Sequence, residues 1–121
     1  MTQYEVTKAY PALMRLSEFR LPVKKARELY KITKQVVEHF QFALSEERKY
    51  ISEFNGQERP DGSVSFNSSD DFDKYKAKMD ELNALEVEWH NSPVILTEAD
   101  IGEQPISPAD IRVLESFVTF E

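Results

Sequence analysis

Cysteine is absent from this chain of 121 residues, and glycine occurs only three times. The absence of cysteine excludes a disulfide scaffold, a thiolate metal site and cysteine catalysis, and it is compatible with a reducing compartment. Three scattered glycines cannot supply a loop that cradles phosphate, and the P-loop, G-x-S-x-G and H-E-x-x-H motifs are all missing. We therefore expect a protein that is not an enzyme.

Long apolar runs are missing as well. No run of about 18 apolar residues could cross a membrane, and the first residues lack the basic and apolar regions of a secretory signal. The chain is 40% hydrophobic and 31% charged, which is typical of a globular protein. Its length suits one compact domain, so we expect a single domain over residues 1–121 and no membrane partner.

Negative charge dominates the whole chain but not its first part. The formal net charge is −7, and the isoelectric point is about 4.9. Residues 1–34 carry eight basic and three acidic side chains, a charge of +5, whereas the other 87 residues carry −12. Such asymmetry can steer an anionic partner to one end of a protein and a cationic partner to the other. The alternative is that these charges only keep the protein soluble.

The spacing of apolar residues predicts helices in the first half of the chain. A short helix is expected over residues 9–19, with Thr7 as its cap and Pro11 in its first turn. A helix of about 33 residues is expected to start at Pro22 and to stop at Asn55-Gly56. Its predicted buried stripe comprises Ala26, Tyr30, Thr33, Val37, Phe40, Leu44, Ile51 and Phe54, widened by Leu29, Ile32, Val36 and Ala43.

The second half predicts smaller elements, which together make the fold α+β and mainly helical. In chain order we expect a β-hairpin over 57–66, a third helix over about 70–85, a second β-hairpin over 87–97, and a short C-terminal helix capped by Ser107 with Ile111, Leu114 and Phe117 buried. The third helix should pack antiparallel on the long one and form a helical hairpin with it. At about 50 Å the long helix exceeds the core, so one end should project, bend or meet a partner.

Two patterns resemble metal sites. Glu86, Glu88 and His90 would share one face of a strand, and two carboxylates with an imidazole could bind a divalent cation. The segment 70–73 resembles part of a calcium loop but lacks its glycine and distal glutamate, and carboxylates that favour a helix start explain it without a metal. His39 lies in the middle of a helix with no orienting carboxylate. We therefore expect no catalytic residue, no metal and no other cofactor.

Two other features are typical of partner-binding surfaces. Lys24, Arg27, Lys31 and Lys34 follow 3–4 spacing and share one face of the long helix, here called the basic face. Such a stripe can follow the phosphates of a nucleic acid, although the chain as a whole is acidic and offers no aromatic-rich strand for stacking. Phe117 and Phe120 form an apolar segment that docks either on the protein's own core or on a partner.

A series of short motifs runs in order between Leu13 and Phe120. The series comprises Leu21-Pro22-Val23-Lys24, the stretch Glu46–Tyr50, Asn55-Gly56, Asp61-Gly62, the stretch Leu82–Glu88, Ile106-Ser107-Pro108-Ala109-Asp110 and Leu114-Glu115-Ser116-Phe117. This order resembles a group of small proteins encoded by tailed bacteriophages and prophages. The resemblance implies a phage origin and a location in the bacterial cytoplasm or in the virion, and it carries over no catalytic residue.

These features predict a non-enzymatic interaction protein, and the resemblance implies that it is of phage or prophage origin. It would act through protein contacts or self-association, in virion assembly or in modulating a host system. The predicted contact residues are the basic face, Lys24, Arg27, Lys31 and Lys34, together with Phe117 and Phe120. Two alternatives remain open: a nucleic-acid-binding accessory protein that uses the basic face, and a small metal-dependent enzyme built on Glu86, Glu88 and His90.

Overall fold

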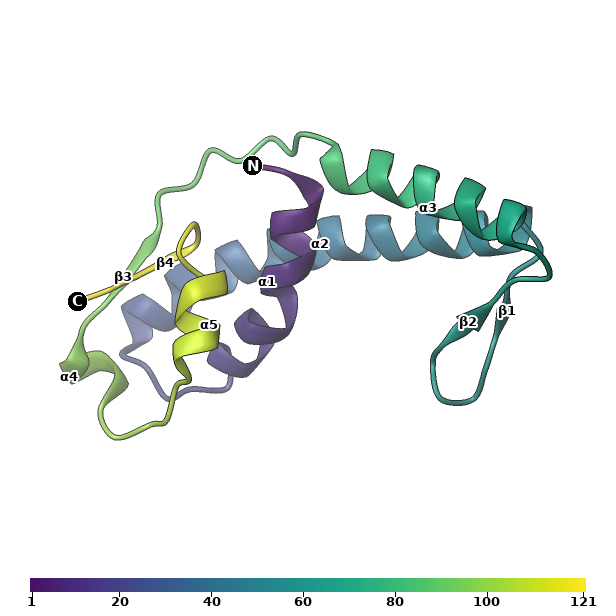
Figure 1. The fold of residues 1–121 in the computed structure, drawn as a ribbon. Coiled ribbons are helices and arrows are strands. Elements are labelled where there is room, and N and C mark those ends of the chain that lie inside the picture. The colour runs from purple at the N-terminus through teal and green to yellow at the C-terminus, as the bar shows by residue number, and fades with distance from the viewer.

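The structure is a computed structural model that describes all 121 residues, and its fold is α+β and mainly helical (Figure 1). The helices are α1 (Gln3–Leu16), α2 (Val23–Glu53), α3 (Ser69–Ala84), α4 (Glu98–Ile101) and α5 (Pro108–Val113). The strands are β1 (Gln57–Glu58), β2 (Val64–Ser65), β3 (Val94–Leu96) and β4 (Val118–Phe120). None of the helices combines the length and the apolar character needed to cross a membrane.

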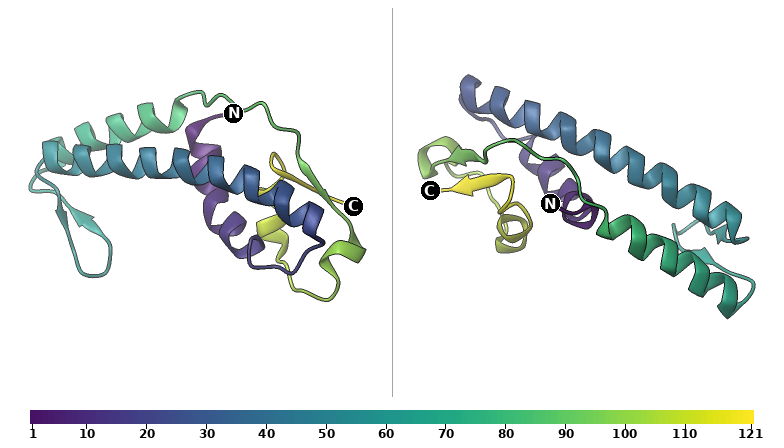
Figure 2. Two further views of the ribbon diagram at one scale, coloured as in Figure 1. Left: turned by 180° about the vertical axis from the view of Figure 1, so that it is seen from behind. Right: turned by 90° about the horizontal axis from the view of Figure 1, so that it is seen from above.

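The long helix α2 joins two parts of the molecule that differ in thickness (Figures 1 and 2). Around its N-terminal half lie α1, α4, α5 and the β3–β4 pair, and we call this part the body. Along its C-terminal half lie only α3 and the β1–β2 hairpin, and we call this part the arm. The predicted helical hairpin is thus present, and α2 extends beyond the body as its length suggested.

The core of the body combines segments from both ends of the chain. Its thirteen buried residues are Val6, Ala9, Ala12, Leu13 and Leu16 of α1, Leu29, Ile32 and Val36 of α2, and Val94, Leu96, Leu114, Phe117 and Val118. Burial of apolar area at about 25 cal/mol per Å² makes this cluster the main source of stability. The arm contributes only Ala43, Ile51 and Leu82 to the buried apolar residues, so it is much less stabilised.

The first helix starts earlier than predicted. Thr2, and not Thr7, is its cap, and the Thr2 hydroxyl accepts a hydrogen bond from the backbone N–H of Glu5 at 3.3 Å. Pro11 therefore lies inside the helix instead of in its first turn, although its ring costs one backbone hydrogen bond there. The extra turns place Val6 in the core, fully buried, and this burial outweighs the cost.

One buried polar side chain ties α1 to its neighbours. Gln3 is 2% exposed, and its amide nitrogen donates to the carbonyl of His39 in α2 and to the hydroxyl of Thr7, both at 3.1 Å. The backbone N–H of Gln3 donates to the carbonyl of Leu85, just after α3, at 2.8 Å. Gln3 therefore lies where the body meets the arm, and its hydrogen bonds compensate for its burial.

The buried face of α2 differs from the predicted stripe. The buried residues are Leu29, Ile32, Val36, Ala43 and Ile51, whereas Ala26 and Tyr30 are exposed. At 100° per residue, the predicted positions Ala26 to Val37 lie about a quarter turn away from the core face. The reason is that α1 and β3 both pack on α2. Leu29, Ile32 and Val36, which the sequence assigned to the margin of the stripe, fill that contact.

The arm follows the sequence closely. Ser68 caps α3 by accepting a hydrogen bond from the N–H of Asp71 at 3.1 Å, and the helix packs antiparallel on α2 (Figure 2). The strands β1 and β2 form the predicted antiparallel hairpin, with Gly62 at a φ of 87° in its turn. The ring of Phe66 lies 4.9 Å from that of Tyr75, which attaches the hairpin to α3.

The predicted second hairpin is wrong. Strand β3 pairs in parallel with β4, which the sequence did not predict, with Val94 opposite Val118 and Leu96 opposite Phe120. Residues 87–90 form no ladder: the backbone N–H of Val87 donates to the carbonyl of Met1 at 2.8 Å, and the Trp89 side chain packs on the core with its ring 5.2 Å from that of Phe117. The connection between β3 and β4 contains the short helices α4 and α5, as a parallel pair requires.

Candidate protein-binding surface

The residues considered for metal binding do not come together. No group of three or more histidine, aspartate or glutamate side chains is placed to hold a metal ion. The expected strand at 87–90 does not form, so Glu86, Glu88 and His90 do not share a strand face. The Glu86 carboxylate instead accepts a hydrogen bond from the N-terminal ammonium group at 3.1 Å.

The basic face lies on the side of α2 that points away from the core. Its four residues are all exposed, and their side chains form no ion pair with any carboxylate of the chain. The neighbouring Lys25, which lies outside this face, does pair with Glu28 at 4.0 Å. The structure therefore brings the four predicted cations together on one surface and leaves them without an acidic partner in the chain.

Helix stability does not explain these cations. The first turn of α2 contains no acidic residue, and its cap, Pro22, makes no side-chain hydrogen bond. The macrodipole of a helix favours anions near its N-terminus and disfavours cations there by about 0.3–1 kcal/mol each. Lys24 and Lys25 stand in this first turn, so the charge distribution of α2 is unfavourable for the helix itself.

An apolar groove runs between the end of α1 and the N-terminal half of α2. Its volume is about 430 Å³, and seven of its eleven lining residues are hydrophobic. One wall comprises Met14, Ser17, Phe19 and Leu21, and the other comprises Ala26, Leu29, Tyr30, Thr33, Lys34, Val37 and Glu38. We call this surface the α1–α2 groove. It exists because the predicted apolar stripe of α2 lies a quarter turn from the core and α1 covers it incompletely.

The groove and the basic face share one edge. Lys34 belongs to the basic face and also lines the groove. Tyr30 stands in the groove wall with 65% of its surface exposed, and Arg27, one turn earlier on α2, is its neighbour on the helix surface. A molecule in the groove would thus contact apolar side chains and at the same time lie beside a row of unpaired cations.

One groove residue carries an unsatisfied polar atom. The hydroxyl oxygen of Thr33 is buried and has no hydrogen-bond partner, although a threonine in a helix commonly bonds to the carbonyl four residues earlier. An unsatisfied buried hydroxyl costs about 1–3 kcal/mol. Valine at position 33 would therefore stabilise the groove wall more than threonine does.

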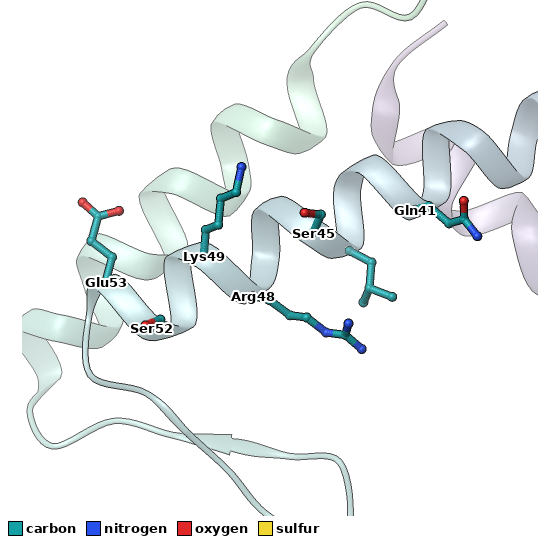
Figure 3. A pocket seen from close by; sticks show the side chains of 7 residues that line it. Gln41, Ser45, Arg48, Lys49, Ser52 and Glu53 are labelled. Atoms are coloured by element: carbon teal, nitrogen blue, oxygen red, sulfur yellow. The ribbon is translucent and has the colours of Figure 1, made fainter.

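A larger hollow lies on the arm but differs in chemistry (Figure 3). It measures about 820 Å³, and all of its lining residues come from one side of α2 between Gln41 and Glu53. Only one of them, Leu44, is hydrophobic, and Figure 3 shows polar side chains such as Arg48 and Lys49 along the helix. An open polar helix face offers few contacts that exclude water, so the smaller apolar groove is the better candidate site.

The two phenylalanines proposed as contact residues lie in different environments. Phe117 is 1% exposed and packs in the core against Trp89. Of the two predicted alternatives, it therefore docks on the protein's own core and not on a partner. Phe120 is half-buried on β4, opposite Leu96. Phe117 therefore offers no surface to a partner in this fold, because the pairing of β4 with β3 holds this segment against the body.

The sequence predicted only part of this surface. Spacing alone identified the basic face, whereas Tyr30 and Val37 were expected in the core and Met14, Phe19 and Leu21 were not recognised as partner-binding residues. A signal was present in the breadth of the apolar stripe on α2. With two parallel rows of apolar residues, one centred on Val36 and the other on Thr33, the helix has more apolar surface than one neighbouring helix covers.

Similarity to known proteins adds no functional assignment. No protein-family model, no curated protein and no solved structure matches this chain. The candidate function therefore depends on the chemistry of the α1–α2 groove and the basic face.

Proposed function

We propose that this chain is a non-enzymatic interaction protein that binds another protein through the α1–α2 groove. The observation that carries the proposal is an open groove of about 430 Å³ with mainly apolar walls, beside four unpaired cations. Apolar pockets with an exposed aromatic residue at the rim are typical of the energetically dominant part of protein interfaces. Exposure of such a surface to water is unfavourable, and a bound partner would remove that cost.

The resemblance to proteins of tailed bacteriophages and prophages supports a setting for this function. It implies a partner in the virion or in the bacterial host, where the protein would assist assembly or modulate a host system. Small proteins that act in this way need a binding surface and no reaction centre.

Site-specific photo-crosslinking tests the proposal. A photoreactive phenylalanine analogue would replace Tyr30 in one variant and Phe72, an exposed aromatic residue of α3, in another. We expect the Tyr30 variant to crosslink to a distinct protein in bacterial cells, whereas the Phe72 variant should give no such product. Equal crosslinking at both positions, or none at position 30, would contradict groove binding.

A second candidate function is supported by the basic face alone. Four exposed and unpaired cations in 3–4 spacing can follow phosphates, so a nucleic-acid-binding accessory role remains a proposal. Such binding would weaken steeply with salt and would be lost when Lys24, Lys31 and Lys34 are changed to Ala. Undiminished retention of this triple variant on a DNA column at low salt would remove the candidate.

A further inference from the structure

We infer that the α1–α2 groove takes an acidic amphipathic helix of the partner protein. This inference rests on the proposed function and names the chemistry of the segment that the groove would recognise. Three observations carry it: the shape of the groove, the charges along its edge, and the backbone of its walls.

The shape of the groove suits a helix. The α2 wall extends from Ala26 to Glu38, about 18 Å or slightly more than three turns at 1.5 Å per residue. A helix in such a groove anchors itself through apolar side chains at positions i, i+3 or i+4, and i+7, which span about 10 Å along its axis. The wall is thus long enough for three anchors.

The α2 wall of the groove disfavours an extended segment. An added strand requires a row of free backbone N–H and C=O groups at a sheet edge. Ala26 to Glu38 lies inside α2, where the backbone groups bond to each other within the helix. The α2 wall can therefore offer only side-chain contacts, and an extended segment lying on it would leave its own backbone N–H and C=O groups unpaired.

The charges at the edge of the groove favour an acidic partner. Lys34 lines the groove, and Arg27 and Lys31 follow the same side of α2, all without an acidic partner in the chain. The one carboxylate of the groove, Glu38, lies one turn after Lys34 at the C-terminal end of the α2 wall and forms no ion pair with it. A bound helix with acidic residues next to its apolar face would pair with these cations, whereas a basic helix would meet four like charges.

Peptide selection on the full chain tests the inference. Peptides of 16 residues from a random displayed library would be selected on the immobilised protein, and their affinities would then be measured on variants. Ala26→Trp fills the groove, and Ala77→Trp is its matched control, because Ala77 is also an exposed helical alanine but lies on α3. Arg27→Glu with Lys31→Glu reverses the basic edge. Arg48→Glu with Lys76→Glu is its control, because both of these residues are exposed and unpaired.

We expect the enriched peptides to be net negative, with apolar residues at i, i+3 or i+4, and i+7. Their affinity should fall at least about tenfold in the groove-filled variant and in the charge-reversed variant, and stay within about twofold in both controls. Circular dichroism would establish that each variant is folded.

Other outcomes would overturn the inference in distinguishable ways. Enriched peptides that are neutral or basic but still sensitive to Ala26→Trp would refute the acidic helix and leave groove binding intact. Enrichment that is insensitive to Ala26→Trp, or no enrichment at all, would refute both. Binding of a 20-base-pair duplex DNA that is lost on charge reversal, with no peptide dependent on that edge, would assign the basic face to nucleic acid instead.

Discussion

Two threonines in the body differ in what their hydroxyl groups bond to. Thr7 accepts a hydrogen bond from the buried amide of Gln3 at 3.1 Å, whereas the Thr33 hydroxyl is buried without any partner. Both residues lie in helices, where threonine and valine have similar propensities. Replacement of each by valine therefore isolates the energetic effect of the hydroxyl group.

We expect opposite effects from these two substitutions. Thr33→Val should raise the free energy of unfolding by about 1 kcal/mol, because it removes an unsatisfied hydroxyl, and Thr7→Val should lower it by a similar amount, because it leaves the Gln3 amide with one bond fewer. Denaturant unfolding followed by the fluorescence of Trp89, the single tryptophan, measures both. Equal losses of stability in the two variants would refute this assignment of the hydroxyl groups.

A charge pair links α1 to α5 and makes part of the stability depend on pH. The Arg15 guanidinium donates to both carboxylate oxygens of Asp110, at 2.6 and 2.9 Å. This side-chain hydrogen bonding, more than the attraction between the two charges, lowers the pKa of Asp110 below its ordinary value. Because the pKa is depressed on folding, the pair stabilises the protein above about pH 4, and this contribution disappears as the pH falls through the lowered pKa.

Asp110→Asn should therefore be less stable than the wild type at pH 7, and the difference should narrow as the pH falls below 4. Thermal unfolding at pH 7, 5 and 3 measures the difference, with Asp73→Asn on the exposed face of α3 as the control. A difference between the wild type and Asp110→Asn that stays constant over this range would show that the pair does not contribute in this way.

At the scale of elements, predictions from sequence held where local signals define the element. The turn at Gly62 lies within the hairpin predicted over 57–66, α3 begins close to its predicted start at residue 70, and Ser107 caps α5 as predicted. The pairing of β3 with β4 could not be predicted, because three residues in each strand carry too little periodicity and their partners lie 24 residues apart. The start of α1 was misjudged because burial of Val6 outweighs the unfavourable Pro11.

The body and the arm should differ in local stability. Helix α1 buries six of its fourteen residues, whereas α3 buries Leu82 alone among sixteen. Because local stability follows buried apolar contact, the amides of α3 should exchange with solvent deuterium at least about tenfold faster than those of α1. Hydrogen exchange followed by mass spectrometry gives both rates. Slower exchange in α3 than in α1 would contradict the division into body and arm.

At the scale of the whole molecule, the uneven charge of the sequence corresponds to a positively charged surface on the body. The excess of cations in residues 1–34 includes the four unpaired residues of the basic face, which border the apolar groove on the body. The sequence predicted that these four cations share one face of α2, because helical spacing is a local property. It could not predict the groove, because only the packing of α1 on α2 decides which apolar row of α2 is covered.

This arrangement predicts that salt slows the association of the partner segment. Exposed charges about 10 Å apart are largely screened at 0.1 M ionic strength, and electrostatic steering acts mainly on the association rate. For a selected peptide we expect the association rate constant to fall several-fold between 20 and 500 mM NaCl, with a smaller change in the dissociation rate constant. Surface plasmon resonance measures both, and an association rate that is independent of salt would contradict a role for the basic face.

The central claim is that a partner binds in the α1–α2 groove, and methyl NMR of the full chain tests it most directly. The tightest-binding selected peptide would be titrated into protein labelled at its methyl groups. We predict shift changes at Met14, Leu21, Ala26 and Val37, which line the groove, and none at Val64 or Ala77 in the arm. Shift changes confined to the arm or to the β3–β4 pair, with the groove methyl groups unmoved, would contradict the claim.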